Sequence, residues 1–77
     1  MDPLLLSVAK DYVRAIETIE RLLREGRTAE AREWEHYRVA LHGELMRALD
    51  RAGITYQDRH HATRIAADIV RYFGEGD

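Results

Sequence analysis

The chain has 77 residues, of which 45% are apolar and 34% are charged, so it can form one small domain around a single core. Twelve basic and fourteen acidic side chains leave a net charge of −2, which argues against a protein that works mainly through a large basic field. The chain contains no Cys, which excludes disulfides and thiolate chemistry and favours a cytoplasmic location.

The first predicted helix covers residues 3–25. Asp2 can cap its start, Pro3 suits the first helical position, and Gly26 can end it. Apolar residues recur along it at helical spacing and form a stripe that can face a second helix. The members of this stripe are Leu5, Ala9, Tyr12, Ile16, Ile19 and Leu23.

The second predicted helix covers residues 29–52 and starts at Thr28 as N-cap. Because the connection to the first helix is so short, the two helices are expected to form an antiparallel hairpin. Gly53 suits the left-handed position of a Schellman ending, in which Ile54 folds back onto Leu49. The stripe that faces the first helix consists of Trp34, Tyr37, Leu41, Leu45, Ala48 and Ala52.

The third predicted helix covers residues 56–73, because Thr55 and Asp58 have the spacing of a capping box. Its apolar face consists of Ala62, Ile65, Ala66, Ile69, Val70 and Phe73. Residues 74–77 are expected to fray. The sequence therefore predicts an all-α fold in which a helical hairpin and a third helix form a three-helix bundle in one domain, residues 1–77.

The apolar arcs of the first two helices are wider than one partner helix requires. A third, shorter helix covers one flank of the hairpin and leaves another open. This excess predicts a homodimer or a larger helical oligomer. The residues expected to mediate self-association are Leu6, Val13, Val39 and Met46.

Two polar residues border these arcs. Glu20 is the one charged residue inside the apolar arc of the first helix, and we expect it to pair with Arg38 or Arg59 across an interface. His42 lies beside Leu45 and is predicted to be an interface histidine that gives assembly some pH sensitivity.

Catalysis finds little support, because the possible acids and bases are scattered and Ser7 has no nearby His in sequence. The chain has no Gly-rich phosphate loop, no cofactor motif, no cationic leader and no apolar run long enough for a membrane span. We therefore expect a non-enzymatic, cytoplasmic module that binds another protein as a regulator, inhibitor or adaptor. Eleven Arg against one Lys suggest a bacterial, phage or mobile-element origin.

The surface groups expected to contact this partner are Arg38, Arg47, His60, Arg64 and Arg71. Trp34 and Tyr37 are expected to be core anchors or, where exposed, binding hot spots. These assignments depend on placing the charged side chains on the outside of the bundle.

Two alternative functions stay open. The first is a nucleic-acid or nucleotide binder that uses a basic stripe on the third helix, made up of Gln57, His60, Arg64 and Arg71. The second is a metal-binding bundle, because the pairs Glu33/His36 and Asp58/His61 have a carboxylate–imidazole spacing seen in such sites. The outward direction of the first pair argues against this second alternative, and no metal site is expected.

Overall fold

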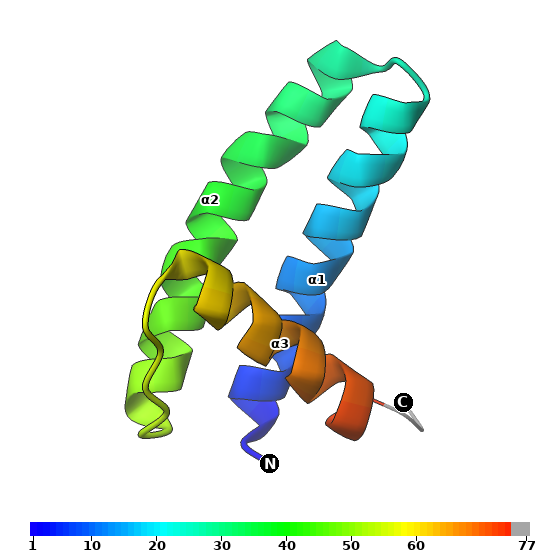
Figure 1. Cartoon of the computed structure of the whole chain (residues 1–77). Coiled ribbons are helices and arrows are strands. Elements are labelled where there is room, and N and C mark those ends of the chain that lie inside the picture. Colours follow the sequence, from blue (N-terminus) through cyan, green and yellow to red (C-terminus); the bar gives the residue numbers. More distant parts are fainter. Residues whose placement is uncertain (75–77) are drawn as a thin grey trace.

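The computed structural model describes residues 1–74 and confirms the all-helical class. The chain forms α1 (Pro3–Arg24), α2 (Thr28–Arg51) and α3 (Arg59–Phe73), and the described part contains no strand. The helices α1 and α2 form an antiparallel hairpin, and α3 crosses one face of it near one end (Figure 1). It packs mainly against α1 and touches α2 at few places. Of the predicted tail, 75–77 lie outside the described residues.

Both long helices end in the same hydrogen-bonded turn. Gly53 has a φ of 73°, and the Ile54 N–H donates to the Leu49 carbonyl oxygen at 3.0 Å, which confirms the predicted Schellman ending of α2. Gly26 has a φ of 74° and plays the same part after α1. Only glycine adopts this backbone conformation without strain, so the two glycines fix where the helices stop.

The start of α2 differs from the prediction. Thr28 is the first helical residue rather than the N-cap, and Arg27 occupies the cap position without a side-chain capping bond. Arg27 instead forms ion pairs with Glu25 at 3.1 Å and with Glu30 at 2.6 Å. These exposed pairs tie the turn together, although each contributes little to stability in water.

The third helix begins three residues later than predicted, because Asp58 rather than Thr55 caps it. The Asp58 carboxylate accepts a hydrogen bond from the His61 N–H at 2.8 Å, and this bond lowers the pKa of Asp58. The His61 Nδ1 accepts from the Gln57 N–H at 2.9 Å, which completes a reciprocal cap. Tyr56 precedes the helix and packs against the core instead of starting it.

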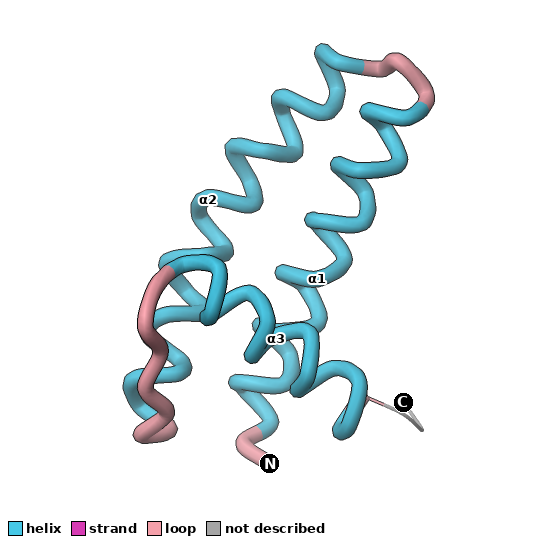
Figure 2. The backbone as a smooth tube through the Cα atoms, viewed as in Figure 1, coloured by secondary structure: helices cyan, strands magenta, loops and turns pink. Residues whose placement is uncertain are grey.

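The core occupies only part of the hairpin. We call the part covered by α3 the proximal half, residues 3–15 and 38–51, and the remaining part the distal half, residues 16–37. The loop that joins α1 and α2 lies at the distal end, well away from α3 (Figure 2). Every member of the buried core cluster belongs to the proximal half or to α3. These members are Leu5, Ala9, Tyr12, Ala15, Leu41, Leu45, Ala48, Leu49, Ala62, Ala66 and Ile69.

The predicted stripes are correct in the proximal half and wrong toward the distal end. Leu22 is buried, whereas the predicted Leu23 is 54% exposed. Tyr37 is 48% exposed, although it was assigned to the facing stripe of α2. An apolar pattern with a seven-residue repeat drifts around a helix of 3.6 residues per turn, so the residues that meet the partner change along the hairpin. At the helix ends, Ala52 and Phe73 are exposed as well.

Candidate functional site

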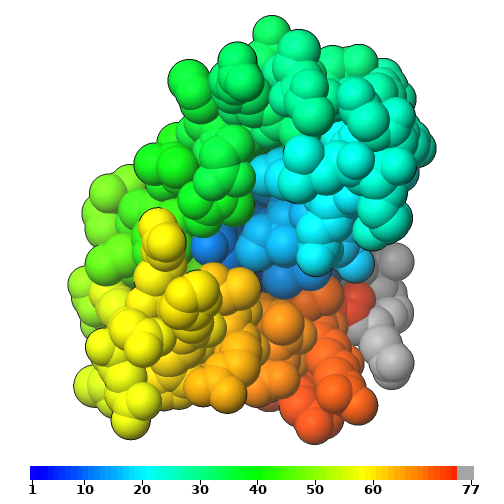
Figure 3. Space-filling model, turned by 45° about the horizontal axis from the view of Figure 1, so that its top comes forward, coloured from blue at the N-terminus to red at the C-terminus, as the bar shows by residue number. Residues whose placement is uncertain are grey.

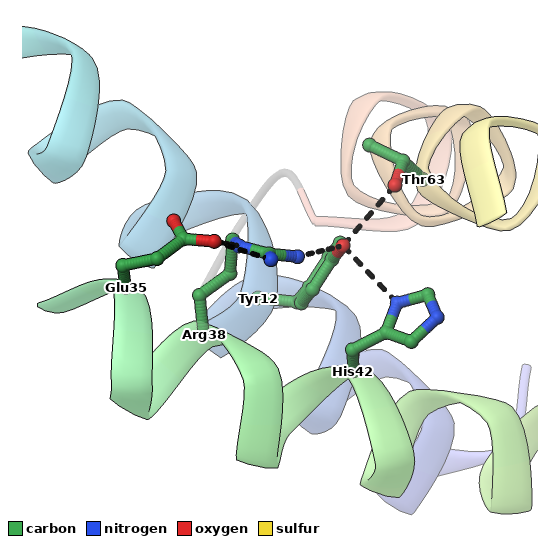
Figure 4. Close-up of polar contacts among 5 residues, drawn as sticks. All are labelled: Tyr12, Glu35, Arg38, His42 and Thr63. Carbon is green, nitrogen blue, oxygen red and sulfur yellow. Dashed lines mark hydrogen bonds and ion pairs between the residues drawn. The ribbon is translucent and has the colours of Figure 1, made fainter.

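A cluster of polar side chains lies where the three helices meet. Its centre is the Tyr12 side chain on α1, which is 1% exposed yet carries a hydroxyl group. This hydroxyl lies 3.2 Å from Arg38 Nη1, 3.2 Å from His42 Nδ1 and 3.1 Å from Thr63 Oγ1. Figure 4 shows these contacts converging on one oxygen atom, with Glu35 bound to the far side of Arg38. We call Tyr12, Glu35, Arg38, His42 and Thr63 the polar cluster.

Each hydrogen bond at the Tyr12 hydroxyl group can be assigned a donor and an acceptor. Thr63 donates its hydroxyl proton to the Arg59 carbonyl oxygen at 3.0 Å, so it can accept a bond from Tyr12. Tyr12 then accepts from Arg38 and from the Nδ1–H of His42. No buried side-chain nitrogen or oxygen among the described residues lacks a partner. The cluster therefore ties α3 to the hairpin at low cost, since its buried polar atoms are satisfied.

The charges of the polar cluster are fixed near neutral pH. Arg38 Nε donates to Glu35 at 2.9 Å, and the Arg38 side chain is only 15% exposed. This bond lowers the pKa of Glu35 and raises the pKa of Arg38, so the pair stays ionised. Burial lowers the pKa of His42, and the positive charges of Arg38 and Arg59 lower it further. His42 is consequently neutral at pH 7.

These contacts bear on three predictions from the sequence. Arg38 is not a free surface group, because Glu35 and Tyr12 already engage it, and its role in partner binding stays a prediction. Glu20 is exposed and pairs with neither of its predicted Arg partners within one chain. His42 bonds Tyr12 within one chain, and its predicted place between copies of the chain stays a prediction.

The polar cluster could have been found from the sequence by one rule. A buried Tyr needs a partner for its hydroxyl group, and Tyr12 was assigned to the facing stripe of α1. Arg38 and His42 are four residues apart on α2, next to the stripe that faces α1, and so could reach that hydroxyl. What the sequence does not give is the path of α3, which brings Thr63 to the same point.

The remaining predicted partner-binding residues do not form one surface. Arg47 is exposed and lines a shallow groove made by α1 and α2 alone, together with Asp11 and Glu44. By contrast, His60, Arg64 and Arg71 are exposed on α3. The spacing of these three residues places them on the outer side of that helix, since its buried residues lie on the opposite side.

The predicted self-association residues differ in exposure. Val39 is 58% exposed, whereas Met46 is partly buried. Leu6 and Val13 are partly buried and pack against the core, and Val13 lines a crevice with Val70 of α3. Part of this surface is therefore already in contact with α3, and its role in self-association stays a prediction.

Neither carboxylate–imidazole pair is part of a larger ligand set. Glu33 and His36 are exposed on α2. His61 uses its Nδ1 atom to accept the bond from Gln57 that caps α3. Within residues 1–74, no three His, Cys, Asp or Glu side chains lie together as a metal ion would require.

An apolar groove opens on the distal half of the hairpin. Its volume is about 320 Å³, and it is lined by Ile19, Leu23, Thr28, Ala31, Arg32 and Glu35. Glu35 belongs both to this groove and to the polar cluster, so the groove begins where the cover of α3 ends. We call the groove lined by these residues the distal groove. The space-filling view also shows a hollow between α2 and α3, with α1 in blue at its floor (Figure 3).

An aromatic pair occupies another side of the distal half. The rings of Trp34 and Tyr37 meet edge to face, with centroids 5.6 Å apart, and form a pocket of about 190 Å³ with Glu33. Residues two positions apart point to nearly opposite sides of a helix, so Tyr37 points away from Glu35 and the distal groove. The distal half therefore presents two separate apolar surfaces.

Comparison of the chain with protein-family models, with curated proteins and with solved structures finds no match. The described helices also include none with the length and hydrophobicity to cross a membrane. Function must therefore be inferred from the residues themselves. The two apolar surfaces of the distal half are among the features that packing within the chain does not explain, and exposed Val39, Tyr72 and Phe73 are others.

Proposed function

We propose that the protein is a non-enzymatic helical module that binds another protein and acts as a regulator, inhibitor or adaptor. The anchor of the binding surface is the Trp34–Tyr37 pair. The observation that carries this proposal is the exposure of Tyr37, which is 48% accessible although Trp34 holds its ring in a defined edge-to-face position.

Interface energetics favour such a pair as a binding hot spot. Trp and Tyr dominate the energetics of protein interfaces, because they bury a large area while losing little conformational freedom. Trp34 packs against the core with part of its surface, so the Trp34 ring that contacts Tyr37 is already held in place. A partner that covers Tyr37 would pay little additional ordering entropy at this point.

The polar cluster supports the non-enzymatic part of the proposal. Its acid, base and cation bond one another, and Tyr12 is buried, which leaves no free group to act on a substrate. The distal groove contributes mainly apolar surface, which suits packing against a helix better than acid–base chemistry.

The test compares recovery of the partner by tagged wild-type protein, by Tyr37→Ala and by Tyr72→Ala, from nuclease-treated extract of the native host. Tyr72 is 70% exposed on α3, so it controls for the general loss of a surface aromatic. We expect a stoichiometric partner with the wild type and the Tyr72 variant. Loss of a hot-spot residue costs at least about 2 kcal/mol, so the partner should bind about 30-fold more weakly to the Tyr37 variant.

Equal recovery by all three proteins would refute the assignment of the anchor. The circular-dichroism spectrum of Tyr37→Ala should match that of the wild type, because the truncated ring is half exposed and lies outside the core cluster.

A second candidate function is supported by the exposure of the basic stripe. The side chains of His60, Arg64 and Arg71 are exposed on the outer side of α3, where they can contact phosphate groups. Binding of this kind weakens steeply with salt and should be abolished by Arg64→Glu combined with Arg71→Glu. Recovery of nucleic acid alone in the experiment above would favour this function over protein binding.

A further inference from the structure

We infer that the pocket lined by Glu33, Trp34 and Tyr37 binds a cationic side chain, Lys or Arg, of the protein partner. We call it the aromatic pocket. The inference rests on the proposed function, because it names the chemical group through which the partner would contact the Trp34–Tyr37 pair. It adds that this pair prefers a positively charged side chain to an apolar one.

The two rings of the aromatic pocket form a corner. Their planes make an angle of 77°, and their centroids are 5.6 Å apart. When the edge of one ring meets the face of another, the corner beside the contact is bounded by the faces of both rings. The face of an aromatic ring attracts a cation that lies within about 6 Å of its centroid. The pocket of about 190 Å³ adjoins Trp34 and Tyr37 alike, so a cation that enters it lies close to both rings.

Glu33 adds a negative charge to this corner. It lies next to Trp34 and four residues before Tyr37, so helical spacing places the three side chains on one side of α2. The Glu33 side chain is exposed, and the ion pairs formed within residues 1–74 use other carboxylates. Its carboxylate is therefore available to accept a hydrogen bond from a bound ammonium or guanidinium group.

No cation of the described part of the chain occupies this position. Within residues 1–74, a guanidinium lies over an aromatic ring at Tyr72, where Arg71 is 5.8 Å from the ring centroid. Arg38, one helical turn after Trp34, is bound by other members of the polar cluster. The rings of Trp34 and Tyr37 are thus left for a cation from another molecule.

The charge of the aromatic pocket distinguishes between possible occupants. A Lys or Arg side chain can place its aliphatic stem along the rings and its charged end beside Glu33. An apolar side chain would cover the same area, but it would remove water from the Glu33 carboxylate without replacing the lost hydrogen bonds. An anionic side chain would be repelled by that carboxylate. Electrostatic complementarity therefore favours a cationic side chain.

The test measures binding of amino-acid derivatives to the free protein, so it requires no partner. The probes are the amides of Nα-acetyl-lysine, Nα-acetyl-arginine and Nα-acetyl-norleucine, titrated into the whole chain at constant ionic strength. Trp34 is the only Trp of the chain, so Trp fluorescence reports on the aromatic pocket. Norleucine has an aliphatic stem like that of Lys but no ammonium group. The tighter of the two cationic probes should bind about tenfold more tightly than the norleucine probe.

Three variants separate the contributions to this binding. Glu33→Gln keeps the size of the side chain but removes its charge, and it should weaken binding of the cationic probe about threefold. Tyr37→Leu keeps an apolar side chain but removes a ring face, and it should weaken that binding about fivefold. Both variants should bind the norleucine probe much as the wild type does. The matched control is Glu20→Gln, which removes an exposed carboxylate of α1 that does not line the pocket and should leave binding unchanged.

Three results would overturn the inference. Equal binding of all three probes would show that the pocket accepts any side chain with an aliphatic stem. The second result is a fluorescence response that does not saturate with either cationic probe. The third is cation binding that both Glu33→Gln and Tyr37→Leu leave unchanged, because the cation would then lie elsewhere on the molecule.

The outcome can be separated from that of the partner-recovery experiment. A partner that is lost with Tyr37→Ala, combined with equal binding of the three probes, would support the proposed function and refute this inference. Selective binding of the cationic probes, combined with equal recovery of the partner by Tyr37→Ala, would refute the proposed anchor while the preference of the pocket for cations stands. If both proposals hold, Glu33→Gln should recover less partner than Glu20→Gln.

Discussion

The two halves of the hairpin are built from the same two helices but differ in what covers them. In the proximal half, α3 adds a third layer, and the largest fully buried side chains, Tyr12, Leu5, Leu45 and Leu49, all lie there. The distal half has two layers and leaves Leu23 and Tyr37 about half exposed. The comparison shows that the buried core is concentrated in one half, while the distal groove and the Trp34–Tyr37 pair lie in the other.

The difference has a simple geometric cause. The helices α1 and α2 have 22 and 24 residues, which at 1.5 Å per residue gives roughly 33 and 36 Å. The helix α3 has 15 residues, about 22 Å, and crosses the hairpin at an angle. It is therefore too short to cover both halves, and its start is fixed by the Asp58 cap.

The largest effect should come from a matched pair of leucines, one in each half. Leu45→Ala removes a side chain that is fully buried, and a change of this kind costs about 2–5 kcal/mol of unfolding free energy. Leu23→Ala removes one that is 54% exposed and should cost far less. Urea unfolding followed by circular dichroism measures both. Similar losses in the two variants would contradict the division into two halves.

A matched pair of tyrosines should give a smaller effect. Tyr12→Phe deletes a hydroxyl that contacts Arg38, His42 and Thr63, and it should cost about 1–3 kcal/mol, because these buried groups lose a partner. Tyr37→Phe removes the hydroxyl group from a side chain that is 48% exposed and should leave the unfolding free energy nearly unchanged. The same unfolding experiment distinguishes them. A neutral Tyr12→Phe would show that the polar cluster does not stabilise the fold.

The smallest effect should come from a pair of histidines and depends on pH. Because burial lowers the pKa of His42 in the folded state, the unfolded chain binds more protons between that lowered pKa and the ordinary value of 6.5. This contribution to stability is fully present above pH 6.5 and is lost as the pH falls through the lowered pKa. The urea concentration at the midpoint of unfolding should therefore decrease as the pH is lowered from 7.5 to 5.5.

Substitution of each histidine locates the source of this pH dependence. His42→Gln should reduce the fall of the midpoint, whereas His36→Gln should preserve it, since His36 is exposed on the distal half. The interpretation fails if the two variants show the same dependence on pH.

The number and order of the helices could be predicted from the sequence, because caps, glycines and apolar spacing act locally. The predicted end of the first helix, residue 25, is one residue from the observed end at Arg24, and Gly53 ends α2 as expected. The start of α3 was wrong because two candidate caps, Thr55 and Asp58, lie three residues apart. Which of these two residues caps the helix depends on how the residues between them pack.

The candidate site was harder to predict, since it depends on contacts between distant segments. Apolar spacing assigned Tyr12 correctly to the buried stripe but does not show which side chains surround its hydroxyl. Arg38 was taken for a surface group because most Arg residues are exposed, whereas its bonds to Glu35 and to the Tyr12 hydroxyl hold its guanidinium where the side chain is only 15% exposed. The distal groove likewise depends on how far α3 reaches.

The bond between Tyr12 and Thr63 joins residues 51 positions apart in the chain. During synthesis on a ribosome, α1 and α2 are complete before α3 has emerged, so the nascent hairpin exposes the proximal core to solvent for that interval. A growing chain therefore displays two open apolar faces, of which only the proximal one is closed later by its own sequence.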